Sequence, residues 1–349
     1  MYDKEKKTLD FSHRLVYYVS RKLFLERNMK FTVLGTGRWG TFITWYLSFR
    51  RYSVTEWGRP GSRALAELIQ TRENEYVKIP ESVRLTDDIT SAIKDADVII
   101  IAIKSQALRQ LATLIKEHGA LDKKIVLCMK GIEEDSGLRL TEIMQELGYD
   151  KNRLAVWVGP GHIQEFVNAK PNCMVIDGYN SELVRELCDA LKSPLIRFYY
   201  GDDIIGSEIG AAAKNVIGIA AGILDGGGMP SLKGPLMARG AREVARLIHA
   251  MGGNELSAYG LCHLGDYETT LFSPYSNNRN FGESIAKGEK FEKLAEGVYT
   301  AKGLKLLGEK YGVDMPITNA VYRVLYEGKN PFTELFGMFE RRTVTEFLL

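Results

Sequence analysis

Two lysines and a glycine-rich turn carry the residue types in this sequence that can do chemistry. The turn reads Gly35-Thr-Gly-Arg-Trp-Gly40, which is G-x-G-x-x-G spacing, and such turns let backbone N–H groups approach a pyrophosphate. Lys130 directly follows the apolar run Ile125–Met129, and Lys214 stands inside the small, apolar stretch Gly206–Gly222. Burial depresses a lysine's pKa toward the range where the amine works as an acid or base. The sequence therefore indicates a dinucleotide site, with Lys130 and Lys214 as the candidate residues for chemistry beside it.

The residues around the turn predict a strand, a tight turn and a helix. Lys30–Leu34 is β-branched and apolar, and Phe42–Phe49 is compatible with a helix. Gly35 permits the turn, Gly37 admits the pyrophosphate and Gly40 allows close packing of helix on strand. The phosphates are then expected at the helix N-terminus. Methyltransferases use a similar loop, but further alternation of β and α patterns to about residue 200 favours a dinucleotide site.

The second predicted strand, Ser53–Trp57, ends where a Rossmann fold meets the adenosine ribose. Arg59 is placed to meet a ribose 2′-phosphate, which favours NADP(H). Glu56 either meets a 2′-hydroxyl, which favours NAD(H), or faces solvent in an alternating strand. Both cofactors stay open, with NADP(H) slightly preferred.

Nearly continuous apolar runs predict a buried, largely parallel sheet. They are Asp97–Ile103, Ile125–Met129 and Leu154–Val158, with weaker strands at Cys173–Ile176 and Ile196–Tyr200 and a helix at Arg63–Thr71. From about Ile204 helical periods replace strand patterns. The expected fold is an N-terminal Rossmann-like doubly wound sheet (29–203) followed by an all-helical C-terminal domain (204–349), with an N-terminal extension (1–28).

Lys214 has two interpretations. An unpaired lysine is costly to bury, so its long stem either reaches solvent or its ammonium faces a polar site. The neighbouring Asn215, and the cation expected at Lys130 on the carboxyl edge of the sheet, favour the polar site.

Composition bounds the function. A chain of 349 residues with 26% charged residues and a formal net charge of +2 gives no overall electrostatic case for nucleic acid or membrane binding. The four cysteines form no C-x-x-C pair, which indicates reduced thiols and a cytoplasmic protein. The five histidines share no ligand spacing, so no metal is expected, and His162 and His263 are interpreted as packing or edge residues.

Residues 1–28 differ from the rest of the chain. Apolar residues from Phe11 to Leu25 recur at loosely helical intervals and are interrupted by arginine and lysine. A short amphipathic helix is expected, which packs on the domain or on a partner subunit or is an extension that the core fold does not need; membrane attachment is a minor alternative. Neither secretion nor a membrane span is expected.

Several ordered motifs resemble the NAD(P)-dependent glycerol-3-phosphate dehydrogenases, from Met29 to about Tyr326. They are the turn Gly35–Thr41 with its tryptophan, Trp57-Gly-Arg59, Lys130-Gly-Ile-Glu133, Lys214-Asn-Val-Ile217 with Ala220–Ile223, Leu264-Gly-Asp266, Ser276–Gly282, Glu296–Ala301 and Met315–Thr318.

The resemblance implies hydride transfer between NAD(P)(H) and glycerol 3-phosphate or dihydroxyacetone phosphate, which supplies glycerol 3-phosphate for phospholipid synthesis, and a homodimer. Lys214 would be the acid–base group, Lys130 would orient the substrate oxygen, and Asp266 would hold Lys214; from the residues alone Asp266 is equally a turn residue. The residues expected to bind substrate are Lys130, Gly159, Gly161, Lys214, Asn215, Asp266, Ser276, Asn278 and Arg279. Those expected to bind the cofactor are Gly35, Thr36, Gly37, Arg38, Trp39, Gly40, Arg59, Lys130, Ile163, Asn277 and Glu296.

The chain departs from the family pattern in two main places. Asn277 stands where the family's S-R-N-R segment has the arginine that clamps substrate phosphate, and Arg279 is the candidate replacement. Gly161 lacks the hydroxyl usual in G-P-S/T-x-A, and His162 is new to the pocket edge. These departures keep two alternatives open: a related dehydrogenase acting on a different phosphorylated or carboxylated alcohol, and a non-catalytic NADP(H)-binding regulator. Retention of both Lys130 and Lys214 argues against the regulator.

Overall fold

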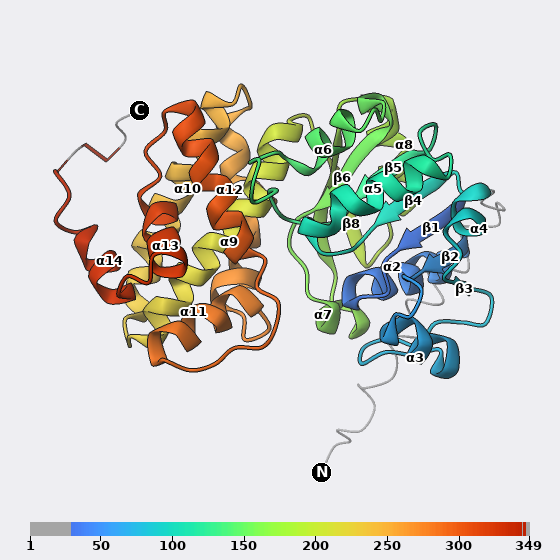
Figure 1. Ribbon diagram of the computed structural model, residues 1–349, viewed down its shortest axis with the longest axis horizontal. Helices are drawn as coiled ribbons and strands as arrows, with labels where there is room; N and C mark the ends of the chain where they lie inside the picture. The colour runs from blue at the N-terminus through green and yellow to red at the C-terminus, as the bar shows by residue number, and fades with distance from the viewer. Residues whose placement is uncertain (1–28, 344, 347–349) are drawn as a thin grey trace, which may run out of the picture.

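The computed structural model describes residues 29–343 and 345–346, and the predicted N-terminal helix within 1–28 lies outside them. An α/β half and a helical half lie side by side (Figure 1). The family resemblance and the physical patterns both predicted this architecture, which is confirmed.

An eight-stranded sheet forms the first half, in the order β3-β2-β1-β4-β5-β6-β7-β8. The strands are β1 (Lys30–Leu34), β2 (Ser53–Trp57), β3 (Arg84–Thr86), β4 (Val98–Ile101), β5 (Lys124–Leu127), β6 (Leu154–Val158), β7 (Asn172–Gly178) and β8 (Ile196–Tyr200). All pairs are parallel except β6 with β7. Sequence reasoning missed β3, because its three residues form no apolar run.

The strand order reverses beside β1, which lies between β2 and β4. Chain segments leaving β1 and β4 therefore diverge to opposite sides of the sheet, and the carboxyl ends of these strands form a crevice of the kind in which open α/β sheets bind ligands. The glycine-rich turn follows β1, and Lys104 follows β4 by three residues.

Helices cover both faces of the sheet, and two large apolar clusters pack between them and the strands. The helices are α2 (Arg38–Phe49), α3 (Arg63–Thr71), α4 (Ile89–Lys94), α5 (Leu108–Glu117), α6 (Leu140–Glu146), α7 (Ile163–Val167) and α8 (Ser181–Leu191). β4 and β6 are buried along their whole length, as expected for strands covered on two faces.

The second half is built around one buried helix, α9 (Ile204–Gly226), which its neighbours surround. The others are α10 (Lys233–Ala250), α11 (Asn277–Lys287), α12 (Gly297–Tyr311), α13 (Pro316–Tyr326) and α14 (Pro331–Gly337). A Cβ atom on Gly222 would lie 1.9 Å from the carbonyl oxygen of Arg279, and one on Gly282 would lie 2.0 Å from that of Ile219. Glycine at these positions thus lets the α9 and α11 backbones touch.

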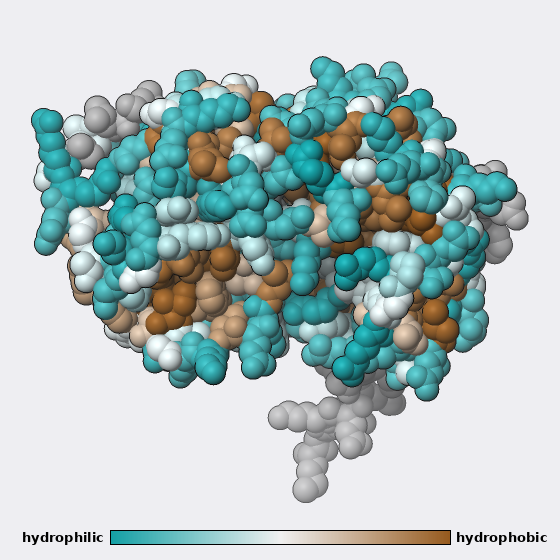
Figure 2. Space-filling model, in the orientation of Figure 1, coloured by the Kyte–Doolittle hydropathy of each residue, from teal (hydrophilic) through white to brown (hydrophobic). Residues whose placement is uncertain are grey.

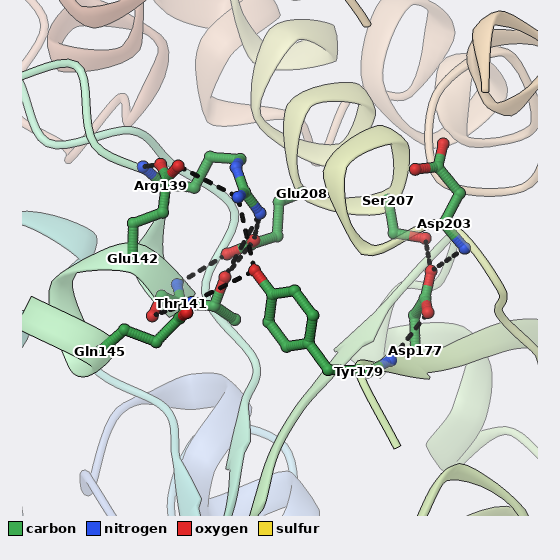
Figure 3. A network of polar contacts seen from close by, with 10 residues as sticks. Arg139, Thr141, Glu142, Gln145, Asp177, Tyr179, Asp203, Ser207 and Glu208 are labelled. Carbon is green, nitrogen blue, oxygen red and sulfur yellow. Dashed lines mark hydrogen bonds and ion pairs between the residues drawn. The ribbon is translucent and has the colours of Figure 1, made fainter. Parts of the chain in front are cut away.

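Buried polar contacts fix the beginning of α9 to the α/β half (Figure 3). Arg139 donates to Glu208 at 2.6 Å, and the Thr141 backbone and hydroxyl donate to the same carboxylate at 2.9 and 2.6 Å. Ser207 donates to Asp177 at 2.7 Å. Removing one partner of such a buried ion pair typically costs about 3–5 kcal/mol. This network therefore sets the position of α9. Lys214 lies six residues after Glu208 on this helix, which is about 9 Å along its axis at ~1.5 Å rise per residue.

Hydrophilic side chains cover most of the face drawn in Figure 2, with hydrophobic side chains gathered in patches over both halves. Within the described residues, α9 alone is long and apolar enough to cross a membrane, and 94% of its most apolar window is buried inside the protein. Its hydrophobicity serves packing of the helical half.

Candidate active site

The glycine-rich turn has the geometry that a pyrophosphate requires. Gly35 has φ +125°, and a Cβ atom there would lie 2.4 Å from the carbonyl oxygen of Ala102. A Cβ atom on Gly40 would lie 1.9 Å from the Gly35 carbonyl oxygen, whereas one on Gly37 would have no heavy atom of residues 29–343 within 4 Å. Gly37 is the N-cap of α2, and no side chain in the described part of the chain caps that helix. Free N–H groups at a helix N-terminus beside open space fit the phosphates of a dinucleotide.

Other residues expected at the cofactor differ in exposure. Arg38 is exposed with its guanidinium 5.5 Å from the Tyr76 ring centroid, and Trp39 packs on Phe42 and Phe166. Ile163 is buried in the same apolar cluster.

Arg59 and Glu56, the two residues expected to discriminate between NADP(H) and NAD(H), differ in exposure at the end of β2. Arg59 is exposed in the loop after β2. Glu56 is fully buried and accepts a hydrogen bond from the Thr41 hydroxyl at 2.7 Å. Burial raises its pKa to about 7, despite lowering by the threonine hydroxyls and Arg72. The alternative in which Glu56 faces solvent is wrong, because α2 covers this face of β2.

Lys130, Lys214 and Asp266 meet at the junction of the two halves. The Lys130 ammonium donates to Asp266 Oδ2 at 2.8 Å and to the Gly159 carbonyl oxygen at 2.7 Å. Lys214 Nζ lies 3.0 Å from the same Oδ2 atom. Lys214 is only 6% exposed, so its stem does not reach solvent and the interpretation as a polar site is confirmed.

The pKa values in this cluster follow from burial and proximity. Burial lowers the pKa of Lys214 to about 8; Asp266 opposes this shift and Lys130 adds to it. Burial would raise the pKa of Asp266, but the two ammonium groups outweigh it and hold that pKa below its usual value. A neutral amine is therefore accessible at Lys214 near physiological pH, next to a carboxylate that stays charged.

Sequence reasoning missed two threonines that complete this cluster. Lys214 Nζ donates to the Thr270 hydroxyl at 2.7 Å, and the Thr269 hydroxyl donates to the Asp266 carboxylate. Both lie on η6 (Glu268–Phe272), a π-helical turn directly after η5 (Leu264–Asp266), and π-helical turns are frequent at functional sites. The sequence offered only the proximity of two hydroxyls to Asp266.

A chain of amides connects the cluster to α11 and α12. Asn215 donates to the Lys130 carbonyl oxygen at 3.1 Å, and Asn278 donates to the Asn215 side chain at 3.0 Å. Asn278 in turn accepts from the Gly297 N–H at 2.9 Å. Ser276 is the N-cap of α11 and accepts from the backbone N–H of Arg279. The structure thus gathers Asn215 and Asn278 beside the lysines.

The loop after β6 brings His162 against the helical half. Gly159 has φ +120°, and a Cβ atom on Gly161 would strike the Phe166 ring at 2.5 Å. The rings of His162 and Tyr275 meet edge to face with centroids 5.5 Å apart. His162 Nε2 is buried without a hydrogen-bond partner among the described residues. His263 is a fully buried packing residue, bonded to the Gly210 carbonyl and the Tyr267 hydroxyl.

Glu296, Asn277 and Arg279 occupy different surroundings. The Glu296 carboxylate accepts from the Ser105 hydroxyl and backbone N–H, and the Asn277 side chain donates to the Leu294 carbonyl at 3.0 Å. Arg279 instead donates to Asp225 at 2.6 Å and lies 3.2 Å from Glu283. Its backbone packs on Gly222, two turns beyond Lys214 along α9. The structure does not bring Arg279 to the lysines, so this arrangement gives its expected phosphate contact no support.

Among the described residues no group of three or more His, Cys, Asp or Glu side chains is arranged to hold a metal ion. A dinucleotide-binding turn joined to a buried lysine in a helical half defines a two-domain dehydrogenase that uses a nicotinamide cofactor.

Comparison with known proteins gives the particular family. Models of the NAD-dependent glycerol-3-phosphate dehydrogenase N-terminus and C-terminus match residues 30–184 and 203–335. A protein of Chlorobium phaeobacteroides (strain BS1) named glycerol-3-phosphate dehydrogenase (NAD(P)+) is 39% identical over 332 residues, which cover 91% of this chain and 99% of the relative. One of the same name from Thermoanaerobacter sp. (strain X514) is 34% identical over 90% of this chain and 97% of its own length.

Among solved structures, the glycerol-3-phosphate dehydrogenase of Coxiella burnetii aligns with a TM-score of 0.84 at 27% identity, over 90% of this chain and 99% of that one. The chain belongs to the NAD-dependent glycerol-3-phosphate dehydrogenase family.

Proposed function

We propose that this chain interconverts glycerol 3-phosphate and dihydroxyacetone phosphate with NADP(H) or NAD(H). The observation that carries the proposal is the buried Lys214 ammonium, held 3.0 Å from Asp266 and beside Lys130, at the junction between a dinucleotide fold and a helical half. Family membership adds the substrate named for the relatives.

The bound nicotinamide supplies or accepts the hydride. Lys214 takes the hydroxyl proton in oxidation and returns it in reduction, and its lowered pKa of about 8 suits both directions. Lys130 points its ammonium at the same oxygen and stabilises developing negative charge. Asp266 fixes both ammonium groups and keeps Lys214 more basic than burial alone would allow.

The remaining binding roles are part of the proposal. Donors for the substrate come from Asn215, Asn278 and Ser276, and the loop containing Gly159 and Gly161 adjoins them through Lys130, whose ammonium donates to the Gly159 carbonyl oxygen. The cofactor is held by the turn from Gly35 to Gly40, by Arg59 at the adenosine ribose, and by Lys130, Ile163, Asn277 and Glu296 toward the nicotinamide. Exposure of Arg59 at the end of β2 supports NADP(H).

A supply of glycerol 3-phosphate for phospholipid synthesis, a cytoplasmic location and a homodimer belong to the same proposal. The four cysteines are free, as suits a reducing compartment. The domain division at 203/204 coincides with the start of α9 at Ile204.

The test measures oxidation of NADPH and NADH with dihydroxyacetone phosphate, then with a panel of 2-keto and 3-keto acids. Lys214→Met should reduce turnover by about 10² or more while leaving cofactor affinity near wild type. Lys233→Met is the matched control, because Lys233 is also 6% exposed but its ammonium is paired with Asp225 at 2.6 Å and not with Asp266. Turnover of a keto acid but not of dihydroxyacetone phosphate would assign the chain to a different substrate, and near-normal turnover in Lys214→Met would remove Lys214 from the chemistry.

A further inference from the structure

The proposed substrate carries a phosphate dianion, and the cations near Lys214 are already engaged. Lys130 and Lys214 share the Asp266 carboxylate. Arg279 is bound to Asp225 and Glu283. Position 277, where the resembling family has an arginine, holds an asparagine whose side chain donates to a backbone carbonyl. The phosphate therefore needs a cation that the recognised motifs do not contain.

Lys104 lies at the carboxyl end of β4, at the reversal of strand order. The segment before it contacts the glycine turn, since a Cβ atom on Gly35 would meet the Ala102 carbonyl oxygen at 2.4 Å and an Ile103 methyl at 3.0 Å. Lys104 is also the N-cap residue of η1 (Ser105–Ala107). This segment therefore runs from the expected pyrophosphate position toward the helical half.

Contacts of the adjoining Ser105 place this segment against the residue after Lys130 and against Glu296. The Ser105 hydroxyl and N–H donate to Glu296, and a Cβ atom on Gly131 would lie 2.5 Å from the Ser105 hydroxyl oxygen. Gly131 follows Lys130 directly, and Glu296 follows Leu294, the partner of Asn277, by two residues. Ser105, which follows Lys104 directly, thus lies between the Lys130 loop and Glu296, the N-cap residue of α12.

The Lys104 side chain is exposed and forms no ion pair with any residue in the described part of the chain. Burial raises the pKa of the Glu296 carboxyl, and the Ser105 hydrogen bonds and the charge of Lys104 oppose that shift, which shows that Lys104 acts electrostatically on this carboxyl. An ammonium without an ion-pair partner at this edge is free to bind an incoming anion.

We propose that Lys104 binds the phosphate of the substrate, in place of the arginine that position 277 lacks. The proposal rests on the proposed function. The pyrophosphate of the cofactor is expected in the same crevice. The experiment therefore distinguishes binding of the substrate phosphate by Lys104 from binding of the cofactor pyrophosphate by Lys104.

The experiment compares wild type, Lys104→Ala, Asn277→Arg and the double variant. KM and kcat are measured for dihydroxyacetone phosphate and for unphosphorylated dihydroxyacetone, and Kd for NADPH is measured by fluorescence. Lys116→Ala is the matched control, since Lys116 is an exposed lysine on α5 outside the site. Loss of one charge-assisted contact should raise KM for dihydroxyacetone phosphate about 10-fold to 150-fold in Lys104→Ala. Activity with dihydroxyacetone and Kd for NADPH should stay within about twofold.

The double variant tests whether positions 104 and 277 serve one phosphate. Asn277→Arg should lower the raised KM of Lys104→Ala by about 10-fold and should change wild type less, because two cations acting on one group are not additive. Equal effects in both backgrounds, an equal loss with the unphosphorylated substrate, or a change confined to NADPH binding would each overturn the proposal. If wild type itself does not turn over dihydroxyacetone phosphate, the proposed function fails first, which separates the two failures.

Discussion

Replacing Asp266 by asparagine isolates the charge that controls Lys214. The change keeps the size of a side chain that is fully buried and removes one negative charge 3.0 Å from Lys214 Nζ. It also leaves the Lys130 ammonium, 2.8 Å from the same oxygen, without its counter-charge.

The expected shift follows from Coulomb's law. Two unit charges 3.0 Å apart attract by about 5 kcal/mol at an effective dielectric constant of ~20. One pKa unit is about 1.4 kcal/mol, so even half of this attraction is worth roughly 2 units. The pKa of Lys214, about 8 in wild type, should therefore fall by roughly 2 units.

The assay is the pH dependence of kcat/KM for glycerol 3-phosphate oxidation, which reports groups of the free enzyme. Wild-type activity should rise with pH to a midpoint near 8, because the base must be the neutral amine. In Asp266→Asn the midpoint should move to lower pH and the plateau should fall, because the amine is a weaker base. Titration of the substrate phosphate is common to all variants and cancels in the comparison.

Asp225→Asn is the control, because Asp225 is also a carboxylate bonded to a buried lysine and lies outside the lysine cluster. Its profile should keep the wild-type midpoint. Urea unfolding of each variant establishes that the protein measured is folded. An Asp266→Asn profile with an unchanged midpoint near 8 would refute the view that Asp266 sets the basicity of Lys214.

Three further predictions concern the cofactor site and its support. Arg59→Ala should raise KM for NADPH more than KM for NADH, and equal changes would show that Arg59 does not contact the 2′-phosphate. Between pH 4.5 and about 7, Glu56 binds more protons in the folded protein than in the unfolded chain. The free energy of unfolding should therefore decline as pH rises through this window, by up to about 3 kcal/mol. Urea titrations at several pH values should show this pH dependence, and Glu56→Gln should flatten it. An unchanged slope in Glu56→Gln would contradict this assignment. Gly37→Ala should weaken cofactor binding in a protein of normal stability, whereas Gly40→Ala should destabilise the fold, because its Cβ atom would lie 1.9 Å from the Gly35 carbonyl oxygen. Thermal melts and NADPH titrations of both variants distinguish these effects. Equal melting temperatures of the two variants would contradict the prediction.

The sequence by itself was enough to predict the architecture and to identify Lys130 and Lys214 as candidate site residues. Runs such as Val98–Ile101 are apolar on both sides because helices cover both faces, and that pattern is local. The glycine spacing likewise follows from local backbone geometry, because Gly35 forms a tight turn and Gly40 allows the helix to contact the end of the strand. The small, apolar residues around Lys214 predicted a buried helix, since a solvated helix face would be polar. The neighbouring Asn215 and Lys130 then favoured a polar site for its ammonium over a stem that reaches solvent.

Tertiary structure decided the partners of these residues. Whether Asp266 was a turn residue or a counter-ion depended on packing η5 against α9, 52 residues away in sequence. Glu56 had an alternating-strand pattern that allowed solvent contact, and only the packing of α2 buried it. Arg279 belonged to the expected substrate set by motif, but the helical register of α11 turned it to Asp225. The partner of a side chain depends on which helices pack together. Contacts between residues far apart in the chain produce no periodic pattern in the sequence, so the sequence alone does not predict them.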